Sequence, residues 1–132
     1  MNRQEKKRYL HGYRYAKIEL RKLKEEYETV YTEAVKIVPT LTGMPSSNVK
    51  DDKTSKYVAR LIELERKIKE CESKVSSIDE EMLNLRPYHK YMITQIDIKR
   101  VPIKVYAKKM NVNEQSVKRM RNRIIDKMFL QG

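Results

Sequence analysis

The fold of this chain depends on the stretch "VYAKKMNVNEQSVKRMRNRI", residues Val105–Ile124. Lys and Arg surround apolar residues that recur at intervals of three and four, and a polar break, "NVN" at Asn111–Asn113, divides the stretch. Apolar spacing of this kind is typical of amphipathic α-helices. The stretch therefore predicts two short helices joined by a tight turn, which is the layout of a helix-turn-helix.

Individual residues of the stretch meet the demands of such a motif. Ala107 is small enough to stand where two helices cross, and Asn111 tolerates the left-handed backbone that the turn needs. Asn113 can cap the second helix, which we place at about 114–128 after a first helix at about 103–110. The apolar side chains expected between the two helices are Tyr106, Met110, Val112, Val117 and Met120.

The polar side chains that this arrangement leaves exposed are of the kinds that bind duplex DNA. In such motifs the first turn of the second helix enters the major groove, where amide, hydroxyl and guanidinium groups meet base edges and phosphates. The candidates for base reading are Gln115, Ser116 and Arg119. The other candidate DNA contacts are Lys118, Asn122 and Arg123, Asn113 at the helix start, and Lys104, Lys108 and Lys109 on the first helix. A helical hairpin with a solvated basic face is the alternative.

The charge of the chain is distributed unevenly. Its net charge is +12, and residues 86–132 hold 12 Lys and Arg against 3 Asp and Glu, or +9. Residues 1–24 hold 9 against 2, or +7, whereas residues 25–85 hold 9 against 13, or −4. Two basic ends around an acidic middle favour a polyanionic partner, nucleic acid or an anionic membrane surface, over a basic surface without a partner.

Two segments carry apolar residues at alternating intervals of four and three, which is a heptad pattern. The first consists of Tyr9, Tyr13, Ala16, Leu20, Leu23, Tyr27, Val30, Ala34 and Ile37. The second consists of Tyr57, Leu61, Leu64, Ile68, Cys71, Val75, Ile78, Met82 and Leu85. Because the two seams match in length and a connector separates them, they favour pairing with each other. A coiled coil between separate chains is the alternative.

The patterns together predict an all-α fold. We expect a long antiparallel two-helix coiled-coil hairpin, with helices at about 4–38 and 54–85 and a linker at 39–53, followed by the C-terminal helix-turn-helix. The predicted domains are a helical hairpin at 1–86 and a DNA-binding domain at 87–132. Between them lies "YHKYMITQIDI", for which a helix is favoured over a strand. The apolar end of the last helix, Ile124, Ile125 and Met128, is expected to dock on it.

The sequence offers little for catalysis or metal binding. The two histidines lack further ligands at metal spacing, no Gly-rich phosphate loop is present, and the acidic pairs are adjacent residues that point apart. We expect no enzyme, no cofactor and no metal. Cys71 is the single cysteine, which fits a reducing compartment, and no apolar run is long enough to span a membrane. Interleaved Tyr and basic residues near the N-terminus could stack on single-stranded bases, but the heptad favours core packing for them.

Two segments of the chain resemble a known protein family. The C-terminal "YHKYMITQIDIKRVPIKVYAKKMNVNEQSVKRMRNRIIDKM" resembles the region-4-like helix-turn-helix of sigma factors, and in particular the phage late-gene transcriptional regulators of the ArpU and RinA type. The segment "LTGMPSSNVKDDKTSKYVARLIELERKI" is similar to the loop and long charged helix of that family. The resemblance covers residues 30–128.

The resemblance implies a DNA-binding regulator of transcription, in particular an activator of phage late genes in the host cytoplasm. The expected partners are double-stranded DNA and, through the hairpin, either host RNA polymerase or a second copy of the chain, with no membrane. Two other functions fit the same layout: a DNA-packaging subunit similar to a small terminase, and a coiled-coil adaptor or inhibitor that binds another protein. The DNA site, the sign of regulation and the oligomeric state are left open.

Overall fold

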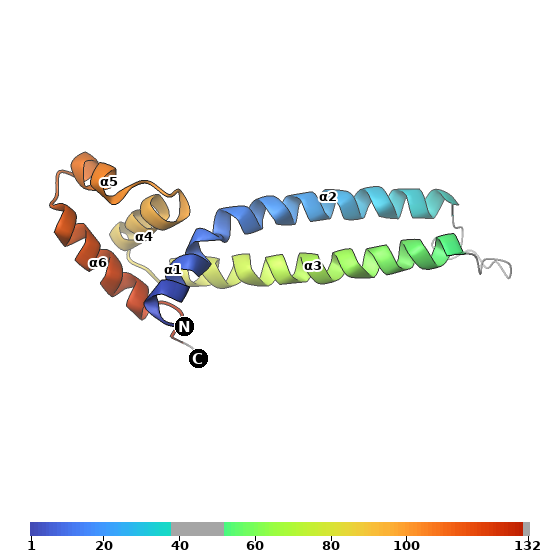
Figure 1. Ribbon diagram of the computed structural model, residues 1–132, viewed down its shortest axis with the longest axis horizontal. Helices are drawn as coiled ribbons and strands as arrows, with labels where there is room; N and C mark the ends of the chain where they lie inside the picture. Colours follow the sequence, from blue (N-terminus) through green and yellow to red (C-terminus); the bar gives the residue numbers. More distant parts are fainter. Residues whose placement is uncertain (38–51, 131–132) are drawn as a thin grey trace. The chain divides into compact units, whose positions relative to one another are not determined.

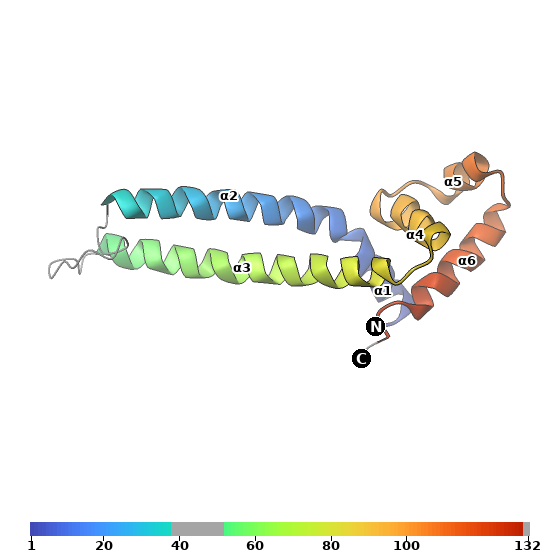
Figure 2. The ribbon, with the colours of Figure 1, turned by 180° about the vertical axis from the view of Figure 1, so that it is seen from behind.

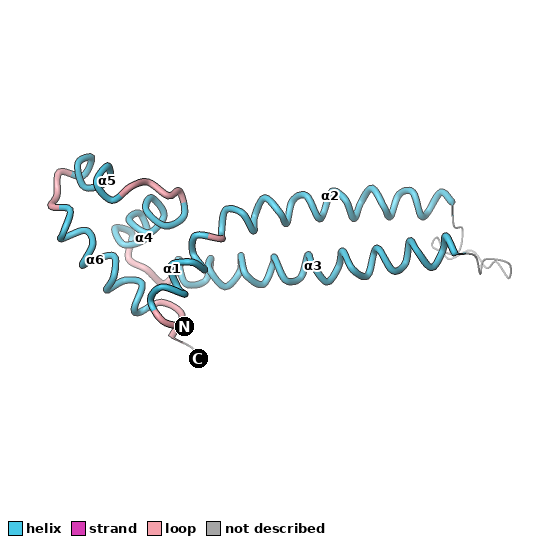
Figure 3. Tube along the Cα trace, viewed as in Figure 1, coloured by secondary structure: helices cyan, strands magenta, loops and turns pink. Residues whose placement is uncertain are grey.

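The computed structural model describes residues 1–37 and 52–130, and within these ranges the protein is entirely helical (Figures 1 and 3). It has six α-helices and one π-helical turn, and the described residues contain no strand. The predicted all-α class is confirmed. The predicted linker at 39–53, with the "TGMP" loop of the family resemblance, falls almost wholly outside the described residues.

The chain forms two compact units, which we call the terminal unit and the middle unit. The terminal unit combines residues 1–16 with residues 74–132, and the middle unit consists of residues 17–73. The long helices α2 and α3 each contribute to both. The division into a hairpin at 1–86 and a DNA-binding domain at 87–132 stays a prediction.

The first predicted helix, at about 4–38, is interrupted, and this expectation of one continuous helix was wrong. The structure has α1 at Arg3–His11 and α2 at Tyr13–Ile37, with Gly12 between them. Glycine is a poor helix former, because its backbone loses the most freedom on folding. A Cβ at Gly12 would also lie 2.4 Å from the Nζ atom of Lys74, so the side chain of Lys74 occupies the space that glycine leaves.

The middle unit pairs α2 with α3 (Asp52–Leu83), and Figures 1 and 2 both show the two helices side by side. Two polar contacts join them: the hydroxyl of Tyr27 donates to Glu65 Oε1 at 3.0 Å, and the Arg60 guanidinium pairs with Glu26. The buried apolar side chains between them, all from the two heptad seams, are Leu23, Ala34, Leu61 and Leu64. Other seam residues such as Tyr27 stay half-buried, since two helices cover only one side of each other.

The terminal unit contains the main apolar core. Its helices are α1, α4 (Pro87–Ile93), α5 (Ile103–Met110) and α6 (Glu114–Lys127), and α4 continues into the π-helical turn at Thr94–Ile98. The core includes Leu10, Ile78, Met82, Met92, Ile93, Ile96, Tyr106, Ala107, Val117, Ile124, Ile125 and Met128. Ile124, Ile125 and Met128 pack with the "YMITQI" segment, as predicted. α1 joins the same core through Leu10, which the sequence had assigned to the hairpin.

Candidate nucleic-acid interface

The turn between α5 and α6 has the geometry that the sequence predicts. Asn111 adopts left-handed backbone angles, φ 56° and ψ 47°. The N–H of Asn111 donates to the carbonyl of Lys108 at 3.2 Å, and the N–H of Val112 donates to the carbonyl of Ala107 at 2.9 Å. These two bonds satisfy carbonyls that the end of α5 would otherwise leave without partners. The chain thereby reverses direction within three residues.

Asn113 begins α6 as a side-chain cap. Its Oδ1 atom accepts hydrogen bonds from the backbone N–H groups of Gln115 at 2.7 Å and Ser116 at 3.3 Å. Glu114 follows in the first turn, where the helix dipole favours negative charge. Because the cap occupies Oδ1, only the amide nitrogen of Asn113 is left to meet a ligand.

Small and apolar side chains hold α5 against α6. Ala107 is 4% exposed and Val117 is 2% exposed, and Tyr106 lies beside them in the core. Met110 and Met120 pack on the edge of this cluster and stay half-buried. Val112, which was expected between the helices, is 41% exposed, so that expectation was wrong. Its N–H closes the turn, and its side chain is left outside.

The candidate DNA-binding side chains lie at the surface of α5, the turn and α6. Nine of the ten are exposed, and Asn122 is half-buried. Lys118 pairs with Glu114 at 3.8 Å, across one turn of α6. In the part of the chain that the structure describes, it is the only one of these candidates with a carboxylate within 4.0 Å. No carboxylate of the described residues neutralises the other lysines and arginines of this set, and Arg119 donates from Nε to the backbone carbonyl of Gln115 at 3.5 Å.

Sequence reasoning did not single out Arg121, which has a different role from its basic neighbours. Its guanidinium binds Asp97 through both carboxylate oxygens, with Nε 3.0 Å from Oδ2 and Nη2 2.5 Å from Oδ1. Asp97 belongs to the π-helical turn and is fully buried, and Nε2 of His11 lies 3.0 Å from its Oδ1. One carboxylate therefore connects α1, the π-helical turn and α6. An acidic residue within the apolar "MITQIDI" was the sequence signal for it.

Part of the N-terminal positive charge also holds α6 in place. The guanidinium of Arg3 donates to Asp126 through Nε at 2.8 Å and Nη2 at 2.6 Å. Lys6 is buried, and its Nζ donates to the backbone carbonyl of Asp126 at 2.9 Å. A cation is favoured there because the last carbonyls of a helix carry partial negative charge. These two side chains stabilise the fold, so the +7 of residues 1–24 overstates the charge that is free to bind a polyanion.

The partial burial of His11 predicts a pH dependence of stability. Burial lowers the pKa of His11 below its ordinary value, aided by the charges of Arg100 and Arg121 and opposed by the hydrogen bond and charge of Asp97. The unfolded chain therefore takes up this proton at a higher pH than the folded chain does. Full stability is present above the ordinary histidine pKa of about 6.5, and it falls as the pH drops through that value.

Urea unfolding at several pH values between about 5 and 8 measures this effect. The midpoint should fall on acidification of the wild type, and His11→Gln should flatten the fall. His89→Gln, which removes the other histidine and leaves the His11–Asp97 contact intact, is the control and should keep the wild-type slope. Equal slopes in the wild type and His11→Gln would show that His11 is not responsible.

Other kinds of site receive no support from the described residues. No group of three or more His, Cys, Asp or Glu side chains there could hold a metal ion. Within the same ranges, no helix combines the length and the apolar character that crossing a bilayer requires. No protein-family model, curated protein or solved structure matches the chain.

Proposed function

We propose that the protein binds duplex DNA in a sequence-dependent manner and regulates transcription. The observation that carries the proposal is the exposed basic and amide-bearing face of α6, held against α5 by the left-handed turn at Asn111 and the buried crossing at Ala107. In finer terms, α5 and α6 form a helix-turn-helix, and α2 and α3 form an antiparallel coiled-coil hairpin.

The physical basis is the way in which a helix fits the major groove. The N-terminal residues of the second helix in such motifs contact base edges, while the first helix crosses the sugar–phosphate backbone of the DNA. Gln115 and Arg119 are four residues apart and share one face of α6. An amide suits adenine, and a guanidinium suits guanine. Lys108 and Lys109 at the end of α5 are then placed for phosphates, which add affinity without sequence information.

The proposed regulatory role is based on the resemblance of the sequence to phage late-gene regulators. An activator of phage late genes needs one surface for DNA and one for the transcription machinery. In this proposal the DNA surface is α6, and the hairpin in the middle unit contacts host RNA polymerase or a second copy of the chain. The double-stranded DNA partner depends on α5 and α6, so DNA binding by the full-length protein can be tested without any partner of the hairpin.

Alanine substitutions separate base reading from phosphate binding. With a DNA site enriched from a random pool, Gln115→Ala and Arg119→Ala should each weaken specific binding by about 1–3 kcal/mol and leave binding to random DNA nearly unchanged. Lys108→Ala and Lys109→Ala should weaken binding to both kinds of DNA and reduce the salt dependence of binding. Fluorescence anisotropy at several salt concentrations measures all of these.

Lys69→Ala is the matched control, because Lys69 is an exposed lysine in the middle unit. It should leave both affinities within about twofold of the wild type, as surface changes away from an interface usually do. Base reading by α6 is excluded if Gln115→Ala and Arg119→Ala reduce binding to random and selected DNA equally. Failure to enrich any site would exclude sequence-dependent binding altogether.

A further inference from the structure

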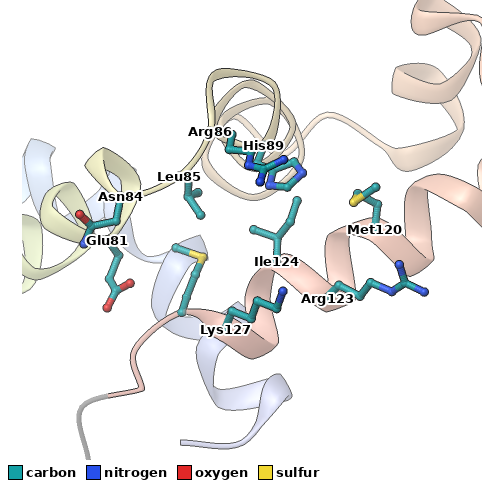
Figure 4. A pocket seen from close by; sticks show the side chains of 10 residues that line it. Glu81, Asn84, Leu85, Arg86, His89, Met120, Arg123, Ile124 and Lys127 are labelled. Carbon is teal, nitrogen blue, oxygen red and sulfur yellow. The ribbon is translucent and has the colours of Figure 1, made fainter.

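A groove of about 520 Å³ lies in the terminal unit, on a flank of α6 (Figure 4). Its accessible apolar surface comes from the half-buried side chains of Leu85 and Met120, and Ile124 and Met128, which are 3% and 1% exposed, lie beneath them in the core. Leu85 follows α3, Met120 and Ile124 belong to α6, and Met128 comes directly after α6. The volume is within the range of about 300–1,000 Å³ that is usual for ligand sites in proteins. Methionine side chains are flexible and polarisable, so such a surface adapts to varied apolar groups.

The rim of the groove is positively charged. Figure 4 shows Arg86 and His89 beside each other on one side, with Arg123 and Lys127 on α6. Glu81 is the single acidic side chain among the lining residues. Neither arginine, nor Lys127, has a carboxylate within 4.0 Å in the described ranges. Arg3 and Arg121 in the same unit are both paired with carboxylates, whereas these three cations are left to meet an acidic ligand.

The groove faces a different direction from the proposed DNA-reading face. Successive residues of an α-helix are rotated by about 100°, so Met120 and Lys127 lie roughly 80–140° around α6 from Gln115 and Arg119. Arg123 is at the border between the two faces. A ligand in the groove therefore leaves the base-reading side chains free, and both surfaces could be occupied together.

We propose that this groove binds an acidic amphipathic segment of a partner protein. The apolar floor is covered by apolar side chains of the segment, and its carboxylates pair with Arg86, Arg123 and Lys127. A DNA backbone would satisfy the cations but would leave the exposed parts of Leu85 and Met120 without apolar partners, which is why a peptide fits better. The inference does not depend on DNA binding by α6, because Arg123 is the one residue that the groove shares with the candidate DNA contacts.

The test uses the full-length protein with ¹³C-labelled methionine methyl groups and a synthetic helical peptide that has Glu on one face and Leu on the other. We expect the resonance of Met120, the half-buried methionine of the groove, to shift on titration. A peptide with Lys in place of every Glu should bind at least about tenfold more weakly, since like charges oppose each other across an interface. Duplex DNA of random sequence is titrated in parallel.

Charge reversal locates the site. The double variant Arg86→Glu, Lys127→Glu should lose about tenfold or more in affinity for the acidic peptide. The matched control Lys104→Glu, Lys108→Glu, which changes the charge equally on α5, should stay within about threefold, because α5 does not line the groove. All four residues are exposed, so the fold should tolerate both variants.

Three results would overturn the inference. One is equal binding of the acidic and basic peptides. Another is equal loss of peptide affinity in the two charge-reversal variants, which would indicate attraction to the whole protein. The third is unchanged peptide affinity in Arg86→Glu, Lys127→Glu with weaker binding to random DNA, which would assign the groove to DNA. Gln115→Ala tests the proposed function separately and should leave peptide binding unchanged.

Discussion

Replacing Asp97 by Ala is expected to lower the free energy of unfolding by about 3–5 kcal/mol, the usual cost of breaking a buried ion pair from one side. The carboxylate is fully buried and binds Arg121 through two oxygens, with His11 beside it. Without it, the guanidinium of Arg121 is left largely buried and unpaired, at 11% side-chain exposure. Far-UV circular dichroism in urea measures the loss.

A double replacement tests whether the loss of stability comes from the unpaired charge of Arg121. Asp97→Leu with Arg121→Met removes both charged groups and keeps apolar volume, so it should recover much of the stability that Asp97→Ala loses. Asp126→Ala, which breaks the exposed pair with Arg3, is the comparison and should cost far less than Asp97→Ala, because solvent screens exposed ion pairs. The interpretation fails if Asp97→Ala stays within about 1 kcal/mol of the wild type, or if the double variant is no better than the single one.

The ion pair of Asp97 with Arg121 also predicts an effect on the DNA binding that we propose. Arg121 is on the inner side of α6, between residues that the sequence assigns to base reading and phosphate contact. Its pair with Asp97 holds the helix against the π-helical turn, while Arg3 and Lys6 hold the last turn. A reading helix must be held rigidly to discriminate between bases. If α6 reads DNA as proposed, Asp97→Ala should weaken specific binding although Asp97 is fully buried.

The local features of the α5–α6 segment were predictable from the sequence. The left-handed turn at Asn111, the cap at Asn113 and the buried crossing at Ala107 each depend on one residue and its immediate neighbours. Rules for caps and turns apply within a few residues, so a single sequence suffices for them. The helical class was predictable for a similar reason, because the apolar period of a helix repeats along the chain.

The contacts that assemble the terminal unit were not predictable. Asp97 meets Arg121 across 24 positions and His11 across 86, and Arg3 meets Asp126 across 123. No periodicity in the sequence records such pairings. The heptad seam also continued through Gly12, so the pattern hid the break between α1 and α2. As a result, the N-terminal basic residues were interpreted as part of a hairpin, whereas Arg3 and Lys6 bind Asp126 in the last turn of α6.

A second large effect is expected at Tyr106, at the centre of α5. The side chain is 1% exposed and packs against the ring of Tyr91, with 6.2 Å between the ring centroids. Truncation of a buried aromatic side chain typically costs about 3–5 kcal/mol, because apolar contacts are lost and a cavity remains. Tyr106→Ala should lower the free energy of unfolding by that amount and loosen α5 from α6, which amide hydrogen exchange of the two helices would show.

Tyr106→Phe separates the ring from the hydroxyl. Burial raises the pKa of Tyr106 to about 12, with a further contribution from the nearby hydroxyl of Tyr88, but the Tyr106 hydroxyl makes no hydrogen bond of normal geometry within the described residues. Removing a buried hydroxyl that makes no hydrogen bond removes a desolvation cost, so Tyr106→Phe should change stability by less than about 1 kcal/mol and could increase it. A loss in Tyr106→Phe as large as that in Tyr106→Ala would mean that the hydroxyl, and not the packing of the ring between α4 and α6, holds α5 in place.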